Sequence, residues 1–431
     1  MKGRRRAVRA TLPVTPPEID VSVRTRVAPP RGVGMAGAPV SFDVITDLER
    51  LEAFADAWRE LLASHQFFVG PEWTLEWLRW RAADLTPYVV VGRDVEGRLA
   101  AVLPLARRAD GELVTCGGSD GSAHVDVVAS AGSSRLAAEG ALTFLAAQKA
   151  PRVRFERLAE DGALLEALRR DVVEGVRVER LATTCPHVLH TGDWTSFLGK
   201  LSKHQRHEVQ RQCRRFLDRP GAGVRFVRTP SECAAGIAEL FDLHARRFAD
   251  LDRPSAFTGD ALREFHTALA TRLARDGRLL LGFLDAEGRT VASAYGFHLG
   301  PATYLFQAGI DPEFHATGAG VVLRAHVLRD EVLGAGRTEL DLLDGCYAWK
   351  LRWATSVRVL LDVDLYPATL GGRARGAVAQ GMASLRATAA DAIKGMRCPG
   401  RSSHEVVDPK YCVRLGCRFA PEPEPTHRTG D

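Results

Sequence analysis

The chain has 431 residues, of which 45% are hydrophobic and 26% are charged, a composition typical of a globular protein with two or three domains. Its formal net charge of +5 arises at the N-terminal end, because residues 1–40 hold eight lysines and arginines against only Glu18 and Asp20. The remainder is nearly neutral, which argues against a nucleic-acid or other polyanionic partner.

Residues 1–40 combine proline with arginine and lack the apolar centre of a signal peptide. We expect a disordered basic arm here, and a solvated tail or a misassigned start explains it better than a nucleic-acid-binding arm. No apolar run approaches the roughly 18 residues that a membrane span needs. The sequence therefore predicts a cytoplasmic protein without a membrane span, and it leaves the oligomeric state open.

The eight cysteines are scattered without the density of a disulfide scaffold, so reduced thiols are expected. Three of them, Cys398, Cys412 and Cys417, stand near His404 in the C-terminal tail. Their spacings do not follow the paired-ligand pattern of structural zinc sites. We therefore predict no metal site.

The first half begins with an amphipathic helix at residues 48–62, for which Asp47 is a candidate N-cap. Two β-rich runs around an Asp/Gly turn at residues 88–107 predict a hairpin. Further strands are expected at residues 113–116, 125–128 and 153–158, with a helix at residues 135–149. Together these elements predict one α/β unit over residues 41–190.

A basic helix follows at residues 200–219, and its cations face either an anionic ligand or solvent. The next elements repeat the order of the first half, and the hairpin at residues 278–299 is the clearest internal echo. The repetition predicts a second α/β unit over residues 191–367. Residues 368–431 are expected to form a partly helical or disordered tail.

Two glycines, Gly318 and Gly320, stand where a strand at residues 303–310 passes into a helix that starts near Val321. The first N–H groups of a helix lack partners within it, and its dipole is positive at this end. A pyrophosphate can therefore bind there through the main chain alone, and glycine allows it to approach closely.

The strand predicted at residues 339–343 leads into "DGCYAWKLRWA". With "LSKHQRHEVQRQCRRF", "LFDLHARRF" and "GIDPEFHATGAGVVLRAHVL" before it, this order of segments resembles the CelD-type and BioF-type branch of the GNAT acetyltransferases, related to the Fem peptidyl transferases. The resemblance spans roughly residues 42–366. It implies an α/β (α+β) fold of tandem GNAT-like domains, each a mixed twisted sheet flanked by helices.

The resemblance also implies an acyl-coenzyme A site in the second half, with acetyl-CoA or another acyl-CoA as co-substrate. The coenzyme A pyrophosphate would lie at Thr317, Gly318, Ala319 and Gly320, although the Gln or Arg that usually precedes the glycines is His315 here. The acceptor pocket would include two residues of "LHARRF", namely His244 and Arg247.

Relatives commonly carry Gly, two acidic residues, Pro, Tyr and Lys after the corresponding strand. Here Gly345 and Lys350 match, whereas Cys346 and Tyr347 replace the acidic pair. Acyl transfer to an amine needs a base, donors for the oxyanion and an acid for the thiolate. Asp344 is the candidate base, directly or through water.

In this scheme Tyr347 would protonate the leaving thiolate. Lys350 either orients an anion or forms a surface salt bridge, because the sequence shows no burial that would lower its pKa. A Cys346 acyl-enzyme lacks a base adjacent in sequence.

The predicted function is acyl-CoA-dependent N-acyl transfer to an amine or amino-sugar of a small molecule, glycan or envelope precursor. Two alternatives stay open. One is Fem-like transfer of an aminoacyl group from charged tRNA, which the basic helix at residues 200–219 favours. The other is a degenerate, non-catalytic GNAT scaffold in polysaccharide assembly, suggested by the departures from the family motifs.

Overall fold

The structure is a computed structural model that describes residues 40–394 apart from residues 131 and 251. The arm predicted at residues 1–40 lies outside this range except for its last residue. The tail cysteines and His404 also lie outside it.

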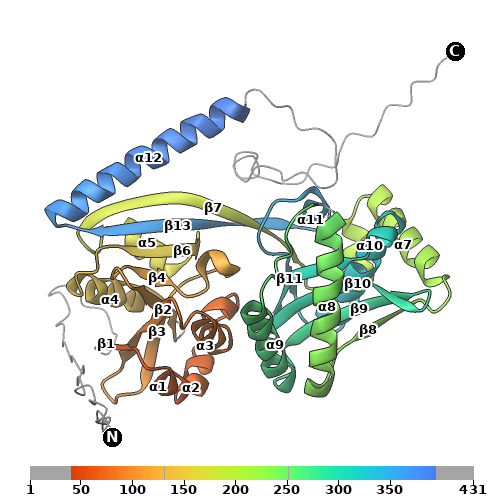
Figure 1. Cartoon of the computed structure of the whole chain (residues 1–431), viewed down its shortest axis with the longest axis horizontal. Coiled ribbons are helices and arrows are strands. Elements are labelled where there is room, and N and C mark those ends of the chain that lie inside the picture. The colour runs from red at the N-terminus through yellow and green to blue at the C-terminus, as the bar shows by residue number, and fades with distance from the viewer. Residues whose placement is uncertain (1–39, 131, 251, 395–431) are drawn as a thin grey trace, which may run out of the picture.

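The first half folds into strands of a mixed sheet with helices on both faces (Figure 1). Its elements are β1 (Ser41–Ile45), α1 (Leu48–Glu52), α2 (Ala55–Glu60), η1 (Phe67–Val69), α3 (Pro71–Trp80), β2 (Leu85–Arg93), β3 (Leu99–Arg108), β4 (Leu113–Thr115), η2 (Gly118–Asp120), β5 (Val128–Ala129), α4 (Ser134–Ala147), β6 (Val153–Ala159), α5 (Ala163–Arg169) and β7 (Gly175–Leu189).

The second half repeats this plan and ends in a long helix. Its elements are α6 (Trp194–Lys200), α7 (Lys203–Leu217), β8 (Gly223–Phe226), α8 (Pro230–Asp250), α9 (Asp260–Arg275), β9 (Leu279–Ala286), β10 (Arg289–Leu299), β11 (Ala302–Ile310), η3 (Pro312–Thr317), α10 (Ala319–His326), the π-helical segment η4 (Val327–Leu333), β12 (Glu339–Asp341), α11 (Ala348–Leu351), β13 (Ser356–Pro367) and α12 (Leu370–Lys394).

One continuous sheet of 13 strands runs through both halves in the order β1-β2-β3-β4-β6-β13-β7-β12-β11-β10-β9-β8, with β5 paired to β3. Most neighbours are antiparallel, but β4 and β6 pair in parallel, as do β11 and β12. Each half therefore contains one parallel pair, with a helix in the intervening chain: α4 in the first half and α10 in the second.

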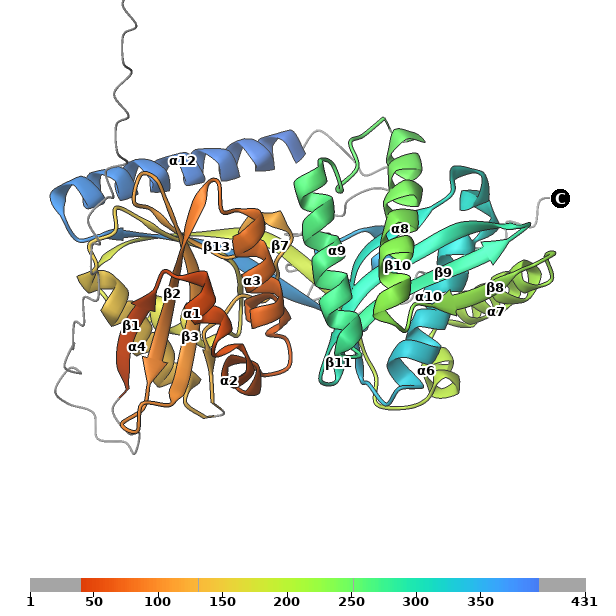
Figure 2. The ribbon, with the colours of Figure 1, turned by 60° about the horizontal axis from the view of Figure 1, so that its bottom comes forward.

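Strands β7 and β13 join the halves, because both run across the first half and reach the second (Figures 1 and 2), where β7 pairs with β12. Their ladder extends from Ser356↔His187 to Pro367↔Gly175. The predicted boundary after residue 190 falls just beyond β7. However, β13, which belongs to the predicted second domain, lies between β6 and β7 and completes the sheet of the first half.

The helix cap and the two hairpins that were expected from short stretches of sequence are present in the structure. Asp47 caps α1, since its Oδ1 accepts the N–H of Arg50 at 2.7 Å. The helix predicted at residues 48–62 is interrupted because Phe54 leaves the helical conformation, with φ −119° and ψ 20°. The predicted hairpins are β2–β3 and β9–β10.

Two hydrophobic cores fill the fold on either side of the second half's sheet. One joins the first half to α8 and α9, and α3 and α9 lie side by side (Figure 2). The other lies under α6, α7 and α10. Helices from both halves therefore pack against the second half's part of the sheet.

Candidate active site

Strands β11 and β12 separate after only three paired positions. Their parallel ladder ends at Tyr304↔Asp341. Beyond it β11 continues along β10 as far as Ile310↔Ala292. The chain after β12 instead follows β7, with the N–H of Leu342 donating to Pro186 O at 3.0 Å. The two parallel strands thus diverge at Tyr304 and Asp341.

Helix α10 begins directly after β11 and η3, and its N-cap is Gly318 in the left-handed conformation, with φ 86°. A Cβ built on Gly318 would lie 2.6 Å from Oε1 of Gln212 on α7. That oxygen is buried without a hydrogen-bond partner, while the Gln212 amide nitrogen donates to Glu208. A polar atom therefore lies unsatisfied against the turn where the pyrophosphate was expected.

At Gly320 a side chain is excluded by close packing and not by a positive φ. A Cβ on Gly320 would meet Cδ1 of Ile310 at 2.6 Å, so its absence lets α10 approach the end of β11. Its neighbour Ala319 is fully buried, and Thr317 uses its hydroxyl to donate to Phe314 O at 2.6 Å. The four predicted residues therefore lie together at one helix N-terminus, and they are compatible with an anion bound by main-chain groups.

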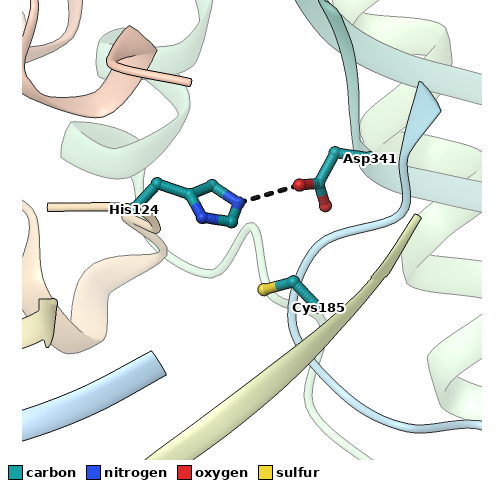
Figure 3. A group of neighbouring side chains, drawn as sticks. All are labelled: His124, Cys185 and Asp341. Atoms are coloured by element: carbon teal, nitrogen blue, oxygen red, sulfur yellow. Dashed lines mark hydrogen bonds and ion pairs between the residues drawn. The ribbon is translucent and has the colours of Figure 1, made fainter. Parts of the chain in front are cut away.

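A buried polar cluster lies where β11 and β12 diverge (Figure 3). His124, from the loop between η2 and β5, points its Nε2 at Asp341 Oδ2, 2.8 Å away. Cys185 of β7 points its sulfur toward the same pair, and one ligand atom of each residue lies within 4.8 Å of the others. The cluster joins the two halves, because 217 residues separate His124 from Asp341.

Asp341 is fully buried yet its pKa is lowered to about 2. Burial opposes this shift, and it is outweighed by His124, by Arg358 at 3.3 Å and by the N–H of Leu343, which donates to Oδ1 at 2.7 Å. Burial raises the pKa of the Cys185 thiol, and the nearby carboxylates raise it further. The structure thus favours a carboxylate beside a protonated thiol.

Nitrogen, sulfur and oxygen donors in one buried group form a set that transition metals accept. However, both oxygens of Asp341 already accept hydrogen bonds, and Arg358 lies beside it. Lys350 is close enough for its charge to interact with Cys185 and Asp341. A divalent ion would add charge beside two cations, so the arrangement suits a histidine–carboxylate pair better than a metal.

Lys350 is buried rather than exposed, which decides between the two interpretations of the sequence against a surface salt bridge. Its Nζ donates to Leu343 O at 3.1 Å and to Asp344 O. Leu343 and Gly345 both have positive φ, 55° and 98°, so the lysine anchors a strained turn. Burial lowers the pKa of Lys350 to about 8.

The other two predicted catalytic residues flank this turn. Asp344 has a side chain that is 54% exposed, and it pairs with Arg157 at 2.8 Å and with the hydroxyl of Thr183. Tyr347 is the N-cap of α11, and its ring lies 5.4 Å from Lys350 Nζ. The three predicted catalytic residues therefore lie in one segment beside the buried cluster.

The predicted acceptor residues lie on α8, against the part of β11 that has no β12 partner. His244 is buried and contacts Ser255 Oγ at 2.9 Å and Gln307 Oε1 at 3.3 Å. Burial lowers its pKa to about 4. Arg247 pairs with Asp250 at 3.4 Å. His244 therefore reaches the diverging strand through Gln307.

Sequence reasoning missed His124, Cys185 and Arg358 because no local spacing connects them to Asp341. It also missed the loop at residues 117–124, which brings Gly121 against the ring of Phe306 on β11. His124 has a left-handed backbone conformation in this loop, with φ 54°, and this conformation cannot be read from the sequence.

A groove of about 1040 Å³ lies elsewhere, between α9 and the helices α2 and α3. Charges of both signs line it, including Arg59, Glu76 and Arg272, and none of the predicted site residues does. Among the described helices, none combines the length and apolar character needed to cross a bilayer.

Comparisons with known proteins identify one domain of the chain and show structures with a similar fold. Residues 203–351 match the family described as "Acetyltransferase (GNAT) domain". Among solved structures, FemX is similar with a TM-score of 0.51 and 12% identity, covering 75% of this chain and 96% of FemX. A conserved protein of unknown function from Bacteroides thetaiotaomicron VPI-5482 gives 0.50 and 11%, covering 76% and 99%.

A tandem GNAT protein from the clavulanic acid biosynthesis pathway aligns with a TM-score of 0.39 and 13% identity, covering 76% of this chain and 98% of that protein. No curated protein matches the sequence. The expected α/β fold with tandem GNAT-like halves is confirmed. Residues 203–351 therefore form a GNAT-type acetyltransferase domain, which supports a transferase.

Proposed function

We propose that the protein is an acyl-CoA-dependent N-acyltransferase whose acceptor is an amine or amino-sugar of a small molecule, glycan or envelope precursor. The observation that carries the proposal is the divergence of β11 and β12 at Tyr304 and Asp341, directly before the glycine-capped N-terminus of α10. Diverging strands and a free helix end provide two anchors for one extended thioester.

On the donor side, the chain would bind phosphate groups at Thr317, Gly318, Ala319 and Gly320. The Oε1 of Gln212 lies against Gly318, buried and without a hydrogen-bond partner, so it leaves the first N–H groups of α10 to a ligand. Rotation of the Gln212 side chain would clear that position for the ligand.

On the acceptor side, the halves meet at the loop that carries His124. Two groups compete for the role of base. Asp344 was predicted from the sequence, but Arg157 and Thr183 already engage its two oxygens. His124 is oriented by the buried carboxylate of Asp341 in the manner of a histidine–carboxylate pair, so it is the stronger candidate.

The proton balance of the transfer follows from these positions. The base takes one proton from the acceptor nitrogen, and Tyr347 returns one proton to the leaving thiolate. Lys350 holds the turn at residues 343–345 through two carbonyl oxygens, so we assign it a positioning role. His244 and Arg247 remain proposed acceptor contacts.

Aminoacyl transfer from charged tRNA is the competing function, and the exposed cations of α7 favour it. Lys203, Arg214 and Arg215 are exposed on that helix, next to α10. The likeness to FemX concerns the fold. Binding decides between the two: purified protein is titrated with acetyl-CoA and, separately, with charged tRNA, and saturable binding of the tRNA alone would refute the proposal.

Turnover is measured as thiol release from acetyl-CoA in the presence of a panel of amines. Binding of acetyl-CoA with release that depends on an amine supports the proposal. No turnover together with no coenzyme A binding would favour the non-catalytic scaffold.

The glycine site has its own control. Gly320→Val should weaken coenzyme A binding at least tenfold, but the new side chain also meets Ile310. The double variant Gly320→Val with Ile310→Ala removes that contact. Binding that stays weak in the double variant indicates ligand approach at Gly320, whereas full recovery shows that the glycine serves packing only.

A further inference from the structure

Arg324 lies on α10, four residues after Gly320, and its guanidinium stacks on the segment that follows β12. Its Cζ lies 4.0 Å from the ring centroid of Trp349 and 5.7 Å from that of Trp353. The residue is half-buried, and its Nε is buried without a hydrogen-bond partner. The two indoles therefore flank a guanidinium whose Nε–H has no hydrogen-bond acceptor.

No described residue forms a salt bridge with Arg324, in contrast to Arg225, a stacked arginine elsewhere in the same protein. Arg225 stacks on Phe283 at 4.2 Å and also pairs with Asp285 and Glu239. Burial lowers the pKa of Arg324 to about 9, and no carboxylate opposes that shift. The guanidinium still carries its charge at neutral pH.

A second cation lies on the same aromatic ring. Lys350 Nζ is 5.6 Å from the Trp349 centroid, and the charge of Arg324 contributes to lowering the pKa of Lys350. Two desolvated cations on one indole repel each other, and burial of an unpaired charge is unfavourable. An anion beside Arg324 would relieve both costs, which makes this position a candidate binding site.

We propose that Arg324 binds an oxyanion of a substrate, either a phosphate or a carboxylate, through the fork of its guanidinium between α10 and α11. A planar guanidinium binds such groups with two parallel hydrogen bonds. Side chains on a helix lean toward its N-terminus, so the fork lies over the turn that begins at Gly320. The segment that carries Trp349 and Trp353, on which the guanidinium stacks, also contains Lys350 and Asp344.

Two sources can supply this oxyanion, and the inference rests on the proposed function for both. One is the phosphates of the acyl-CoA donor, because the proposed phosphate site is one turn away. The other is an anionic group on the acceptor, such as the carboxylate of an amino acid or the phosphate of an amino-sugar. The chemistry at Arg324 is the same in both cases.

The test compares the wild-type chain with Arg324→Gln, Arg324→Lys and the control Arg329→Gln. Arg329 lies on η4 of the same helical stretch and pairs with Asp330, so its replacement removes equal charge without touching the stack. Calorimetry measures the binding of coenzyme A, pantetheine, inorganic phosphate and acetate. Circular dichroism confirms folding, and Arg324→Lys, which keeps the charge but loses the fork, carries the test if Arg324→Gln does not fold.

We expect at least tenfold weaker oxyanion binding in Arg324→Gln, a smaller loss in Arg324→Lys and no change in Arg329→Gln. Weaker coenzyme A binding with unchanged pantetheine binding assigns the site to the donor. Unchanged coenzyme A binding with weaker phosphate or acetate binding assigns it to the acceptor.

The outcomes also separate this inference from the proposed function. If the wild-type chain binds no coenzyme A, the proposed function fails, while the phosphate and acetate arms still test Arg324. Equal affinity of every probe for a folded Arg324→Gln and the wild type would overturn the inference. So would wild-type protein that binds none of the four probes.

Discussion

Each half of the chain contains one parallel strand pair, β4–β6 or β11–β12, but different groups lie beyond the end of each pair. In the first half, β4 and β6 pair at Leu113↔Val153 and Val114↔Arg154. Directly beyond, Thr115 Oγ1 accepts the N–H of Glu156 at 3.0 Å, and an isolated bridge joins Val125 to Leu158. Side chains and a neighbouring loop of the first half therefore fill the position where its strands would diverge.

In the second half, charged side chains lie near the end of the β11–β12 pair. Some are buried away from water, and one has no acidic partner. Asp341 and Lys350 are buried beside it, and Arg324 has no salt bridge within the described part of the chain. The first half thus packs against the second, and its His124 forms a hydrogen bond with Asp341 of the second half. In the proposed function, the second half carries the chemistry and the first half supports it.

The largest expected effect comes from breaking the link between the halves at Asp341. Asp341→Ala should lower the free energy of unfolding by about 3–5 kcal/mol, because it leaves His124 buried without its carboxylate and removes one of the two carboxylates that pair with Arg358. Urea unfolding measures the change. The control Asp344→Ala should cost less than about 1 kcal/mol, since that carboxylate is largely exposed. Equal losses in the two variants would contradict the contrast between them.

The second half should also respond more strongly to acid. His244, His266 and His298 all lie there, and burial lowers their pKa values to about 4, 3 and 3. The unfolded chain titrates near 6.5, so the stability that these neutral histidines contribute is complete above about pH 6.5 and falls toward pH 3–4. At pH 5 each should cost about 2 kcal/mol.

Urea midpoints at pH 7 and pH 5 test this expectation. His266→Gln should remove about 2 kcal/mol of the difference in stability between pH 7 and pH 5, because it deletes one histidine that burial keeps neutral in the folded chain. His204→Gln, on the exposed face of α7, should leave the dependence unchanged. An unchanged slope in His266→Gln would show that the acid sensitivity arises elsewhere.

A smaller effect on stability is expected at Lys350. Lys350→Met leaves Leu343 O and Asp344 O without their donor, which should cost about 1–2 kcal/mol. Because its pKa is lowered to about 8, activity that depends on the charged amine should decline as the pH rises through 8. The pH–rate profile of Lys350→Arg should lose this alkaline decline, and a profile identical to the wild type would exclude a role for the charge.

The comparison of halves also explains which features the sequence could predict. The hairpins β2–β3 and β9–β10 follow from short alternating runs around Asp/Gly-type turns, so a local window contains the whole signal. The glycines before α10 are likewise a local pattern. Strands β7 and β13 were not predicted, because they are stabilised by pairing across the chain, as at Pro367↔Gly175.

The same distinction applies to the site. Lys350, Tyr347 and Asp344 were identified from one continuous motif, whereas His124 joins Asp341 across 217 residues. Burial is a property of the fold, so the sequence could not reveal that Lys350 is buried. Arg324 resembles any polar residue of an amphipathic helix until its two tryptophans are placed beside it.

The smallest expected effect lies on α12, which covers β7 and β13 of the first half (Figure 1). Its Gly376 faces the sheet, where a Cβ would lie 2.6 Å from Cβ of Val176. Val378 and Met382, on the outer surface, are 64% and 51% exposed. Replacing both by serine should change the free energy of unfolding by less than about 0.5 kcal/mol, because both residues stay more than half exposed.

Gly376→Val is the matched change on the inner surface of the same helix, and it should cost more than about 1 kcal/mol, because the new side chain overlaps Val176. Urea unfolding of both variants gives the contrast. If the serine variant is destabilised as much as Gly376→Val, the outer surface of α12 must be buried in the native protein. The support half would then have a contact surface of its own, independent of the chemistry in the second half.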